Sequence, residues 1–297
     1  MYQGKHVRHR RARSVLTRLL LFVLCLFLLW PFAEPYTLEV DQQTISSDGL
    51  PADVGQLRIV YASDFHLRGF PFLTKGRLDS IVSRINALNA DLVLLGGDYA
   101  ERPEDTIAFF RSLGNIHASY GVYAILGEHD RTLSDDEESL RSLRVMLRSK
   151  GINLLLNSVE TIRIGNASIY LAGLDDVNSG WPDLKRVAAG VHQEDYVIFL
   201  CHSPEIIPSA QTAVDQNGRR GWFDLGLFGH THGGQLALFG PLLHLADGID
   251  AHYLSGWLVE NRTPMLISRG IGASVVPMRW MRSPQIHLIT VRSTRTK

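Results

Sequence analysis

The chain has 297 residues, 45% of them hydrophobic, and its 30 basic side chains equal its 30 acidic ones in number. Its length and composition are typical of one sizeable folded domain, alone or with an appendage. The first 33 residues hold six basic side chains and no acidic one, so the rest carries a net charge of −6, which argues against a nucleic-acid-binding surface.

An apolar segment at residues 19–33 follows this basic head. Its fifteen uncharged residues suit the hydrophobic region of a signal peptide and are short for a membrane-spanning helix, which needs about 20. Counting back to Val15, with Arg18 extending toward the headgroups, lengthens the run to nineteen residues and permits a span. Pro31 stands where a signal-peptidase site needs a small residue. We expect a membrane anchor in residues 1–33, with a cleaved signal peptide and a monotopic helix as alternatives.

An anchor with basic residues on its amino-terminal side keeps that side in the cytoplasm. The expectation is therefore a single-pass protein of the cell membrane whose catalytic domain lies outside the cytoplasm. The same orientation follows if the segment is a cleaved signal peptide.

Residues 34–56 are predicted to form a linker with one short strand near residues 36–40. From residue 57 onward, patterns of buried strands and amphipathic helices alternate. Strands are expected at 57–62, 91–95, 121–126, 152–156, 159–164, 168–172, 196–200, 223–228, 263–268 and 285–291. Helices are expected at 75–90, 103–113 and 184–188, and a further helix is expected to end at Lys150. This order predicts an α/β domain over residues 57–297, with two β-sheets packed face to face and helices outside them.

Eight Asp, Glu and His residues directly follow five of the predicted strands: Asp64, His66, Asp98, Glu128, His129, His202, His230 and His232. The carboxyl ends of strands are where open α/β sheets bind ligands. Any one of these residues would be typical of a turn or a helix cap. Together, their carboxylates and imidazoles favour a divalent cation such as Mn, Fe, Zn or Mg over copper. The sequence therefore predicts a metal site at the strand ends.

The blocks around these residues resemble the calcineurin-like metallophosphoesterase family, whose motifs run D-x-H, G-D, G-N-H-[DE], a later H, and G-H-x-H. They stand here as Asp64-Phe65-His66, Gly97-Asp98, Gly127-Glu128-His129-Asp130, His202 and Gly229-His230-Thr231-His232, within a match from residue 57 to about 291. Gly233-Gly234-Gln235, the late Ser268-Arg269-Gly270-Ile271-Gly272 and the apolar N-terminal segment resemble the membrane-associated bacterial branch. Some members of that branch are phosphodiesterases, and some are UDP-2,3-diacylglucosamine pyrophosphatases.

The resemblance implies a four-layer α/β/β/α sandwich with two divalent metal ions at the strand ends. It implies that Asp64, His66 and His232 hold the first ion, that Asp98 bridges both, and that Glu128, His202 and His230 hold the second. It also implies hydrolysis of a phosphodiester or pyrophosphate bond by in-line attack of a metal-bridging hydroxide. The chain has no G-x-S-x-G or P-loop pattern that would supply another mechanism.

His129 is implied to bind no metal, but to contact the phosphate and to stabilise or protonate the leaving oxygen. Its ring needs a partner that holds it in place. Glu101, three residues after Asp98, and Asp130 are the two candidates.

Position 128 departs from the family pattern, because Glu128 stands where the family has Asn. A carboxylate there would bind the second metal more tightly but offset part of its charge. It would alternatively swing away and leave a water as the ligand.

The leading hypothesis is a membrane-anchored phosphoesterase, with a lipid-linked phosphoester as one option for its substrate. One alternative is a UDP-2,3-diacylglucosamine pyrophosphatase, although that substrate forms on the cytoplasmic side. The alternative of another class is a metal-binding membrane scaffold that lost catalysis when Glu128 replaced Asn.

Signals for the substrate are weaker. Seven aromatic or flexible apolar residues near predicted loops are expected to pack in the core or at interfaces, with an acyl or base pocket as the alternative: Trp181, Trp222, Tyr253, Trp257, Met278, Trp280 and Met281. Arg269 and the Arg219-Arg220 pair are candidates for contact with phosphate or anionic lipid, and a solvated loop is the alternative for the pair.

Overall fold

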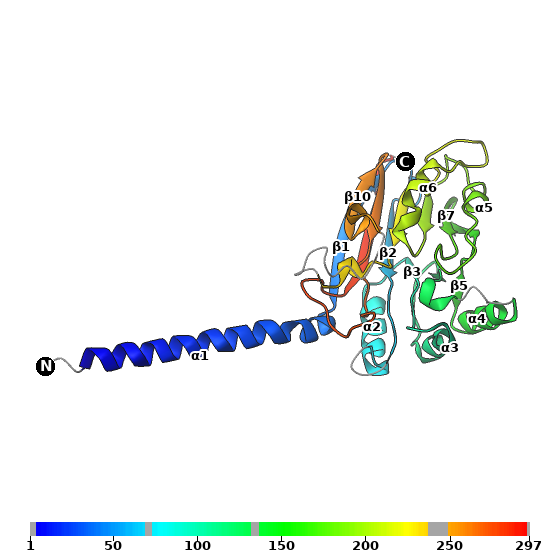
Figure 1. Ribbon diagram of the computed structural model, residues 1–297. Coiled ribbons are helices and arrows are strands. Elements are labelled where there is room, and N and C mark those ends of the chain that lie inside the picture. Colours follow the sequence, from blue (N-terminus) through cyan, green and yellow to red (C-terminus); the bar gives the residue numbers. More distant parts are fainter. Residues whose placement is uncertain (1–3, 69–72, 132–136, 237–248, 296–297) are drawn as a thin grey trace.

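The computed structural model describes residues 4–68, 73–131, 137–236 and 249–295, with side chains from Ser14 onward. A long helix, α1 (Gly4–Ala33), leaves a layered body at one corner (Figure 1). Residues Ser14–Tyr36 form a stretch of 23 with a mean hydropathy of 2.3, long and apolar enough to cross a membrane. Most of this stretch is exposed, so its apolar character is not explained by burial in a protein core.

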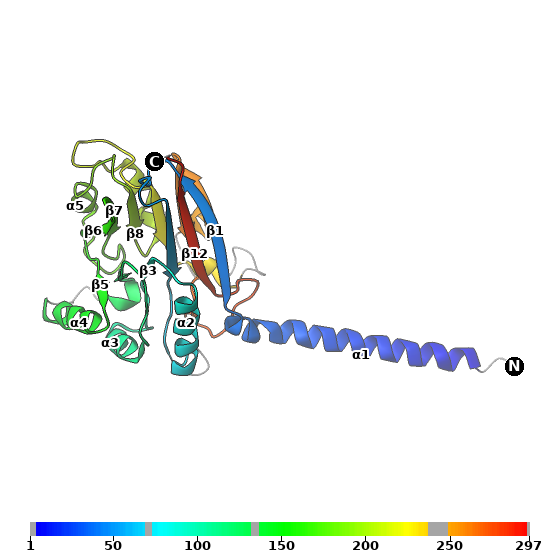
Figure 2. The same ribbon diagram turned by 180° about the vertical axis from the view of Figure 1, so that it is seen from behind.

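Two six-stranded sheets form the centre of the body (Figures 1 and 2). The first has the order β1 (Glu39–Ser47), β12 (Gln285–Ser293), β2 (Gln56–Ala62), β3 (Leu92–Leu95), β4 (Val122–Ala124) and β5 (Ile152–Leu154). The second has the order β10 (Gly256–Glu260), β11 (Thr263–Ile267), β9 (Leu225–Phe228), β8 (Val197–Leu200), β7 (Ala167–Gly173) and β6 (Ser158–Ile164). The central strands of each sheet are parallel, so their carboxyl ends meet at one edge.

Alternate residues of the central strands pack on opposite faces of the sheets. In β2, Ile59 and Tyr61 lie in the core between the sheets, whereas Val60 and Ala62 pack against helices. Helices α2 (Lys75–Ala87), α3 (Pro103–Ser112) and α4 (Glu137–Ser149) cover the outer face of the first sheet, and α5 (Leu184–Ala188) and α6 (Ile207–Thr212) cover that of the second. The predicted arrangement of two packed sheets flanked by helices is confirmed.

The helix α2 shows how local sequence sets these elements. The hydroxyl of Thr74 accepts a hydrogen bond from the backbone amide of Arg77, which caps the helix. Leu78 and Ile85 belong to its buried stripe, which packs on the first sheet. The helix ends three residues before the predicted residue 90, because Asn89 adopts a left-handed backbone with φ of 48°.

The segment 34–56, predicted as a linker with a strand near residues 36–40, instead supplies the nine-residue strand β1. Most of β1 is polar and at least partly exposed, because it lies at the edge of the first sheet and, among the described residues, pairs only with β12. The short strand β10, at the edge of the second sheet, was not predicted either. Edge strands of this kind lack the continuous apolar run that marks a buried strand.

The amino end of β1 lies at the same end of the sheet as the carboxyl end of β2. It runs parallel to β12, with Glu39 opposite Gln285, and β12 runs antiparallel to β2, with His287 opposite Tyr61. Helix α1, which leads into β1, therefore joins the body at the edge where the carboxyl ends of the parallel strands meet (Figures 1 and 2).

Candidate metal centre

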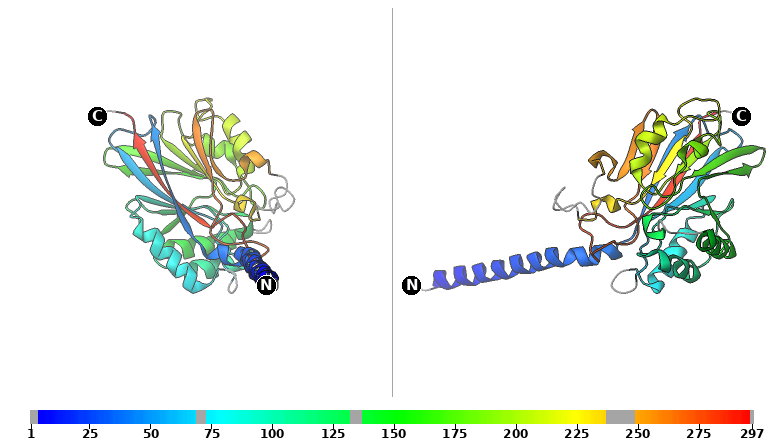
Figure 3. Two further views of the ribbon diagram at one scale, coloured as in Figure 1. Left: turned by 90° about the vertical axis from the view of Figure 1, so that its left-hand side faces the viewer. Right: turned by 45° about the vertical axis from the view of Figure 1, so that its right-hand side comes forward.

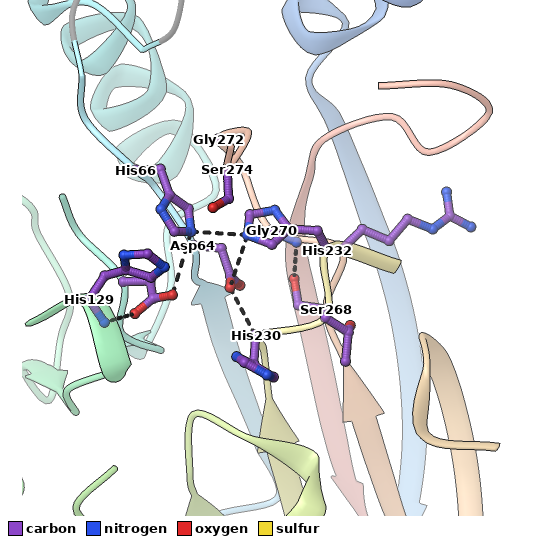
Figure 4. Close-up of polar contacts among 12 residues, drawn as sticks. Asp64, His66, His129, His230, His232, Ser268, Gly270, Gly272 and Ser274 are labelled. Carbon is purple, nitrogen blue, oxygen red and sulfur yellow. Dashed lines mark hydrogen bonds and ion pairs between the residues drawn. The ribbon is translucent and has the colours of Figure 1, made fainter. Parts of the chain in front are cut away.

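The eight residues predicted to form the site come together between the carboxyl ends of β2, β3 and β4 in one sheet and of β8 and β9 in the other. Figure 4 shows Asp64, His66, His129, His230 and His232 among them. The eight residues form overlapping groups of three in which the potential ligand atoms lie within 4.8 Å of one another. These groups are Asp64, His66 and His232; Glu128, His202 and His230; Asp64, Asp98 and His202; and Asp98, Glu128 and His129. Side chains far apart in sequence thus share one largely buried space.

Five of these residues hold a left-handed backbone conformation, which costs a non-glycine residue free energy. The φ angles are 54° at Asp64, 46° at His66, 54° at Asp98, 70° at His230 and 50° at His232. At each of these positions the chain turns directly after a buried strand. Strained backbone is typical of functional sites, where the surrounding fold enforces it.

The loop after β11 helps to enforce the turn at Asp64. The backbone amides of Ile271 and Gly272 donate to the carbonyl of Asp64, at 3.2 and 2.7 Å. A Cβ on Gly272 would lie 2.1 Å from the carbonyl oxygen of Phe65, and one on Gly270 would lie 2.5 Å from the Cβ of Asp64. Only glycine fits these two positions, which accounts for the Gly-x-Gly pattern noted in the sequence.

Asp64, His66 and His232 form the first group. Nε2 of His232 lies 2.9 Å from Nε2 of His66 and 3.8 Å from Oδ1 of Asp64. Burial, followed by the positive charges of His66 and Arg279, holds the pKa of His232 well below its usual value, so this ring is neutral and suited to bind a metal. Oδ2 of Asp64 is buried and has no hydrogen-bond partner among the described residues. A cation in this group would bind all three side chains.

The second group contains His202, His230 and Glu128. Nδ1 of His202 lies 2.7 Å from the carbonyl oxygen of Gly96, a geometry that favours a proton on Nδ1 and directs Nε2 to the site. Nδ1 of His230 lies 2.6 Å from Oε2 of Glu128. Burial opposes protonation of His202, but Asp98 and other carboxylates raise its pKa well above the usual value. The space around these rings therefore favours positive charge, as a cation site requires.

Asp98 lies between the two groups. Its Oδ2 is 3.1 Å from Nε2 of His202 and 3.5 Å from Nε2 of His66, which belong to different groups. Its Oδ1 accepts the backbone amide of His129 at 3.0 Å. Although burial opposes ionisation, His202 and His66 hold the pKa of Asp98 below its usual range. This position fits the predicted role of a carboxylate shared by two metal ions.

The ring of His129 is held differently from the prediction. Its Nδ1 lies 2.8 Å from the backbone carbonyl oxygen of Glu101, while the carboxylate of Glu101 lies 3.1 Å from Nδ1 of His66. Burial lowers the pKa of His129, but Asp98, the Glu101 carbonyl and Glu128 together raise it above the usual value. Glu101 thus orients both histidines, and its side chain serves His66.

Asp130, the other predicted partner of His129, has a structural position instead. It is 5% exposed, and its carboxylate accepts the backbone amides of Asp98, Tyr99 and Gly127 at 2.6, 3.0 and 3.0 Å. The hydroxyl of Thr106 adds a fourth hydrogen bond at 3.0 Å. Burial and the neighbouring Asp98 raise the pKa of Asp130 to about 7. Its hydrogen bonds join the loops after β3 and β4 and do not orient the ring of His129.

Sequence patterns missed two side chains beside the site. Arg279 is fully buried, and its guanidinium lies 3.1 Å from Nδ1 of His232 and 2.8 Å from the carbonyl oxygen of Arg269. Nδ2 of Asn178 lies 3.4 Å from Oε2 of Glu128. Neither residue belongs to a motif block, and only the fold brings them to the site.

Trp222 and Trp280, two of the seven aromatic or flexible apolar residues that were expected to pack in the core or at interfaces, do so. Trp222 is buried against Phe199, with ring centroids 4.9 Å apart, and Trp280 packs on α1. Arg219 pairs with Glu194 on the surface, which fits the solvated-loop alternative. By contrast, Met281 is 60% exposed and Trp181 is 66% exposed. Tyr253 lines a cavity whose lining includes none of the candidate metal ligands.

Comparison with known proteins agrees with the geometry. The family model described as calcineurin-like phosphoesterase matches residues 57–234. The chain is 28% identical to the Bacillus subtilis metallophosphoesterase YkuE over 89% of this chain and 88% of that protein. It is 30% identical to a Danio rerio protein described as a transmembrane protein with metallophosphoesterase domain, over 94% of this chain and 63% of that protein.

A phosphopantetheinyl hydrolase from Mycobacterium tuberculosis is similar in structure, with a TM-score of 0.41 and 10% identity over 73% of this chain and 91% of that one. The family match covers all the strand ends that carry the candidate ligands, from Asp64 to His232. On the strength of that match, the chain belongs to the calcineurin-like phosphoesterase family and is a metal-dependent phosphoesterase.

Proposed function

We propose that this phosphoesterase is anchored in the membrane by α1 and hydrolyses a phosphodiester or pyrophosphate bond in a lipid-linked substrate. The observation that carries the proposal is the common position of the site and the anchor. Candidate ligands from both sheets gather at the carboxyl ends of the strands, and α1 joins the body at that same edge. A substrate held in the lipid around α1 would have a short way to the site.

The proposed metal ligands are those of the two groups, with Asp64, His66 and His232 for one ion and Glu128, His202 and His230 for the other, and Asp98 shared. The unpartnered Oδ2 of Asp64 and the close pair of imidazole nitrogens at 2.9 Å fit such occupancy. When bound, two divalent ions supply Lewis-acid stabilisation of phosphoryl oxygens and activate water.

The proposed role of His129 is to donate a proton to the leaving oxygen. Its Nδ1 lies against the carbonyl oxygen of Glu101, so the proton on Nδ1 is committed to that bond. Nε2 is left for the substrate, 3.9 Å from Oε1 of Glu128. A protonated ring would carry its second proton on Nε2, from which the leaving oxygen would accept it.

The orientation of the chain in the membrane decides between substrates. The basic residues in the amino-terminal half of α1 support a cytoplasmic N-terminus and an extracytoplasmic catalytic domain. An inverse orientation would favour the alternative substrate, the pyrophosphate bond of UDP-2,3-diacylglucosamine. The scaffold alternative requires metal binding without hydrolysis of either bond.

The full-length protein, purified in detergent, tests the proposal with a chromogenic phosphodiester and a chromogenic pyrophosphate, each with added Mn and after chelation. We expect metal-dependent hydrolysis that is lost in Asp98→Asn together with bound metal. The lipid part is tested by comparing a phosphodiester lipid in mixed micelles with its water-soluble headgroup ester. Equal turnover of the two would contradict a lipid-linked substrate, and metal binding without any turnover would support the scaffold.

A further inference from the structure

The carboxyl-terminal end of α1 and the residue after it are hydrogen-bonded to one segment of the body, residues 273–283. This segment directly follows the loop that contains Gly270 and Gly272. The backbone amide of Arg279 donates to the carbonyl of Pro31 at 2.9 Å. The carboxylate of Glu34, which is 2% exposed, accepts the backbone amides of Met281 and Arg282 at 2.8 and 2.6 Å. These three hydrogen bonds fix the segment against the end of α1 (Figures 1 and 3).

The segment also reaches along α1 into its apolar part. The rings of Phe27 and Trp280 make an edge contact, with centroids 5.0 Å apart. Phe27 lies six residues before the end of α1 at Ala33, which is about 9 Å along a helix that rises 1.5 Å per residue. If α1 spans a bilayer, residues 273–283 cannot stay entirely in the aqueous phase, because Trp280 lies beside the spanning stretch.

The side chains of residues 273–283 suit a position at the membrane interface. Val275 is 63% exposed and Met281 is 60% exposed, while Trp280 is 8% exposed against α1. The chain has no acidic residue after Glu260, and the segment carries the partly exposed Arg282 beside the buried Arg279. Exposed apolar side chains, a neighbouring Trp and a partly exposed arginine, Arg282, are typical of a surface that contacts the headgroup region of a bilayer.

We infer that residues 273–283 form a second membrane contact, in which Val275 and Met281 enter the acyl region and Arg282 meets lipid phosphate. The partner is the lipid surface around α1. This inference rests on the membrane anchorage proposed above, and adds that the catalytic domain itself lies on the bilayer. Together, α1 and residues 273–283 would restrain rotation of the body about the carboxyl-terminal end of α1. They would also hold the loop of Gly270 and Gly272, and with it Asp64, close to the lipid.

Depth-dependent fluorescence quenching tests the contact in the full-length chain, reconstituted into bilayers that contain doxyl-labelled lipids. Cys25 lies exposed on α1 and Cys201 is buried, so a polarity-sensitive dye on the native Cys25 reports the anchor. In a Cys25→Ser background, Val275→Cys reports the segment. Val145→Cys on α4 is the matched control, because Val145 is also 63% exposed and its helix packs on the outer face of the first sheet.

We expect doxyl groups near the top of the acyl chain to quench the dye at position 275 at least about twofold more than the dye at 145, as for a segment 5–10 Å into the interface. Met281→Cys should behave like Val275→Cys. Quenching at Cys25 with equal, weak quenching at 275, 281 and 145 would overturn the second contact and leave the anchor intact. Absence of quenching at Cys25 would overturn the anchorage, and the second contact with it, without bearing on hydrolysis.

Discussion

The carboxylate of Glu101 lies 3.1 Å from Nδ1 of His66, while the carbonyl oxygen of Glu101 lies 2.8 Å from Nδ1 of His129. One residue therefore orients a candidate metal ligand with its side chain and a candidate proton donor with its main chain. Because a substitution changes only the side chain, the two functions of Glu101 can be separated by experiment.

Replacing Glu101 by Ala should weaken metal binding and spare the orientation of His129. Removing a carboxylate that holds a metal-ligating imidazole costs about 10–100-fold in metal affinity. We expect this loss in metal titrations followed by calorimetry, with turnover recovering at high metal concentration. Glu101→Gln, which keeps a hydrogen-bond acceptor for His66, should restore most of the affinity. A variant with wild-type affinity and a permanently low rate would show that the carboxylate serves His129 instead.

His129→Ala should keep both metal ions and lose rate. General acids contribute roughly 10²–10⁴-fold to turnover, so we expect a decrease of that order at saturating metal. Metal content by elemental analysis separates this variant from Asp98→Asn. A clear loss of metal in His129→Ala would mean that His129 is a ligand.

Glu128→Asn should lower metal affinity and raise turnover at saturating metal. The carboxylate of Glu128 lies 2.6 Å from Nδ1 of His230, so it stands where a ligand of the second ion would stand. Its charge would strengthen binding but reduce the pull of the ion on the phosphate. Both effects come from one carboxylate and should appear together. Unchanged affinity and rate would place Glu128 outside the coordination sphere.

Asp224, at the opposite end of β9 from His230, should make stability depend on pH. Burial raises the pKa of Asp224 from 3.8 to about 6, against the hydrogen bond from the amide of Val197. The folded state therefore binds this proton more tightly, and the stability it contributes below pH 4 is lost as the pH rises through 6. The loss is at most about 3 kcal/mol.

Thermal unfolding of the wild type and of Asp224→Asn at pH 4.5 and 7.5 measures this effect, because pH effects at other groups are common to both proteins. The variant should gain stability relative to the wild type between the lower and the higher pH. The same difference between the proteins at both pH values would contradict the raised pKa.

Reporter fusions at the C-terminus should place the catalytic domain outside the cytoplasm. The six basic residues in the amino-terminal half of α1 favour a cytoplasmic N-terminus. We expect an active alkaline-phosphatase fusion and a dark green-fluorescent-protein fusion. The reverse pattern would favour a cytoplasmic domain and the lipid-A-precursor substrate.

Much of the fold follows from the sequence because its central strands are buried on both faces. Strands such as β3 are continuous apolar runs bounded by glycine or acidic residues, and their pattern admits few other structures. The edge strand β1 was placed wrongly because a polar strand is stabilised by its hydrogen bonds to β12, a partner more than 200 residues away. Local pattern carries no information about such a distant partner.

The candidate ligands were predicted as a set because each directly follows a strand, and parallel strands bring their ends together. The residues that contact and orient these ligands were not predicted correctly. Glu101 was predicted to serve His129 by its side chain, but side-chain direction depends on packing, and its carboxylate contacts His66. Arg279 reaches His232 from a loop 47 residues later, in a segment with no motif.

The position of β12 between β1 and β2 has a consequence for how the chain matures. β1 has no other neighbour in the described part of the chain, so it stays unpaired until residues 285–293 have left the ribosome. If α1 is already held in the membrane by then, the first strand waits at the bilayer while the rest of the domain is synthesised and translocated. The last strand then completes the sheet in a single late step. A chain truncated before residue 285 would expose two unpaired strand edges beside the membrane, and it would be a substrate for quality-control proteases rather than a partly active enzyme.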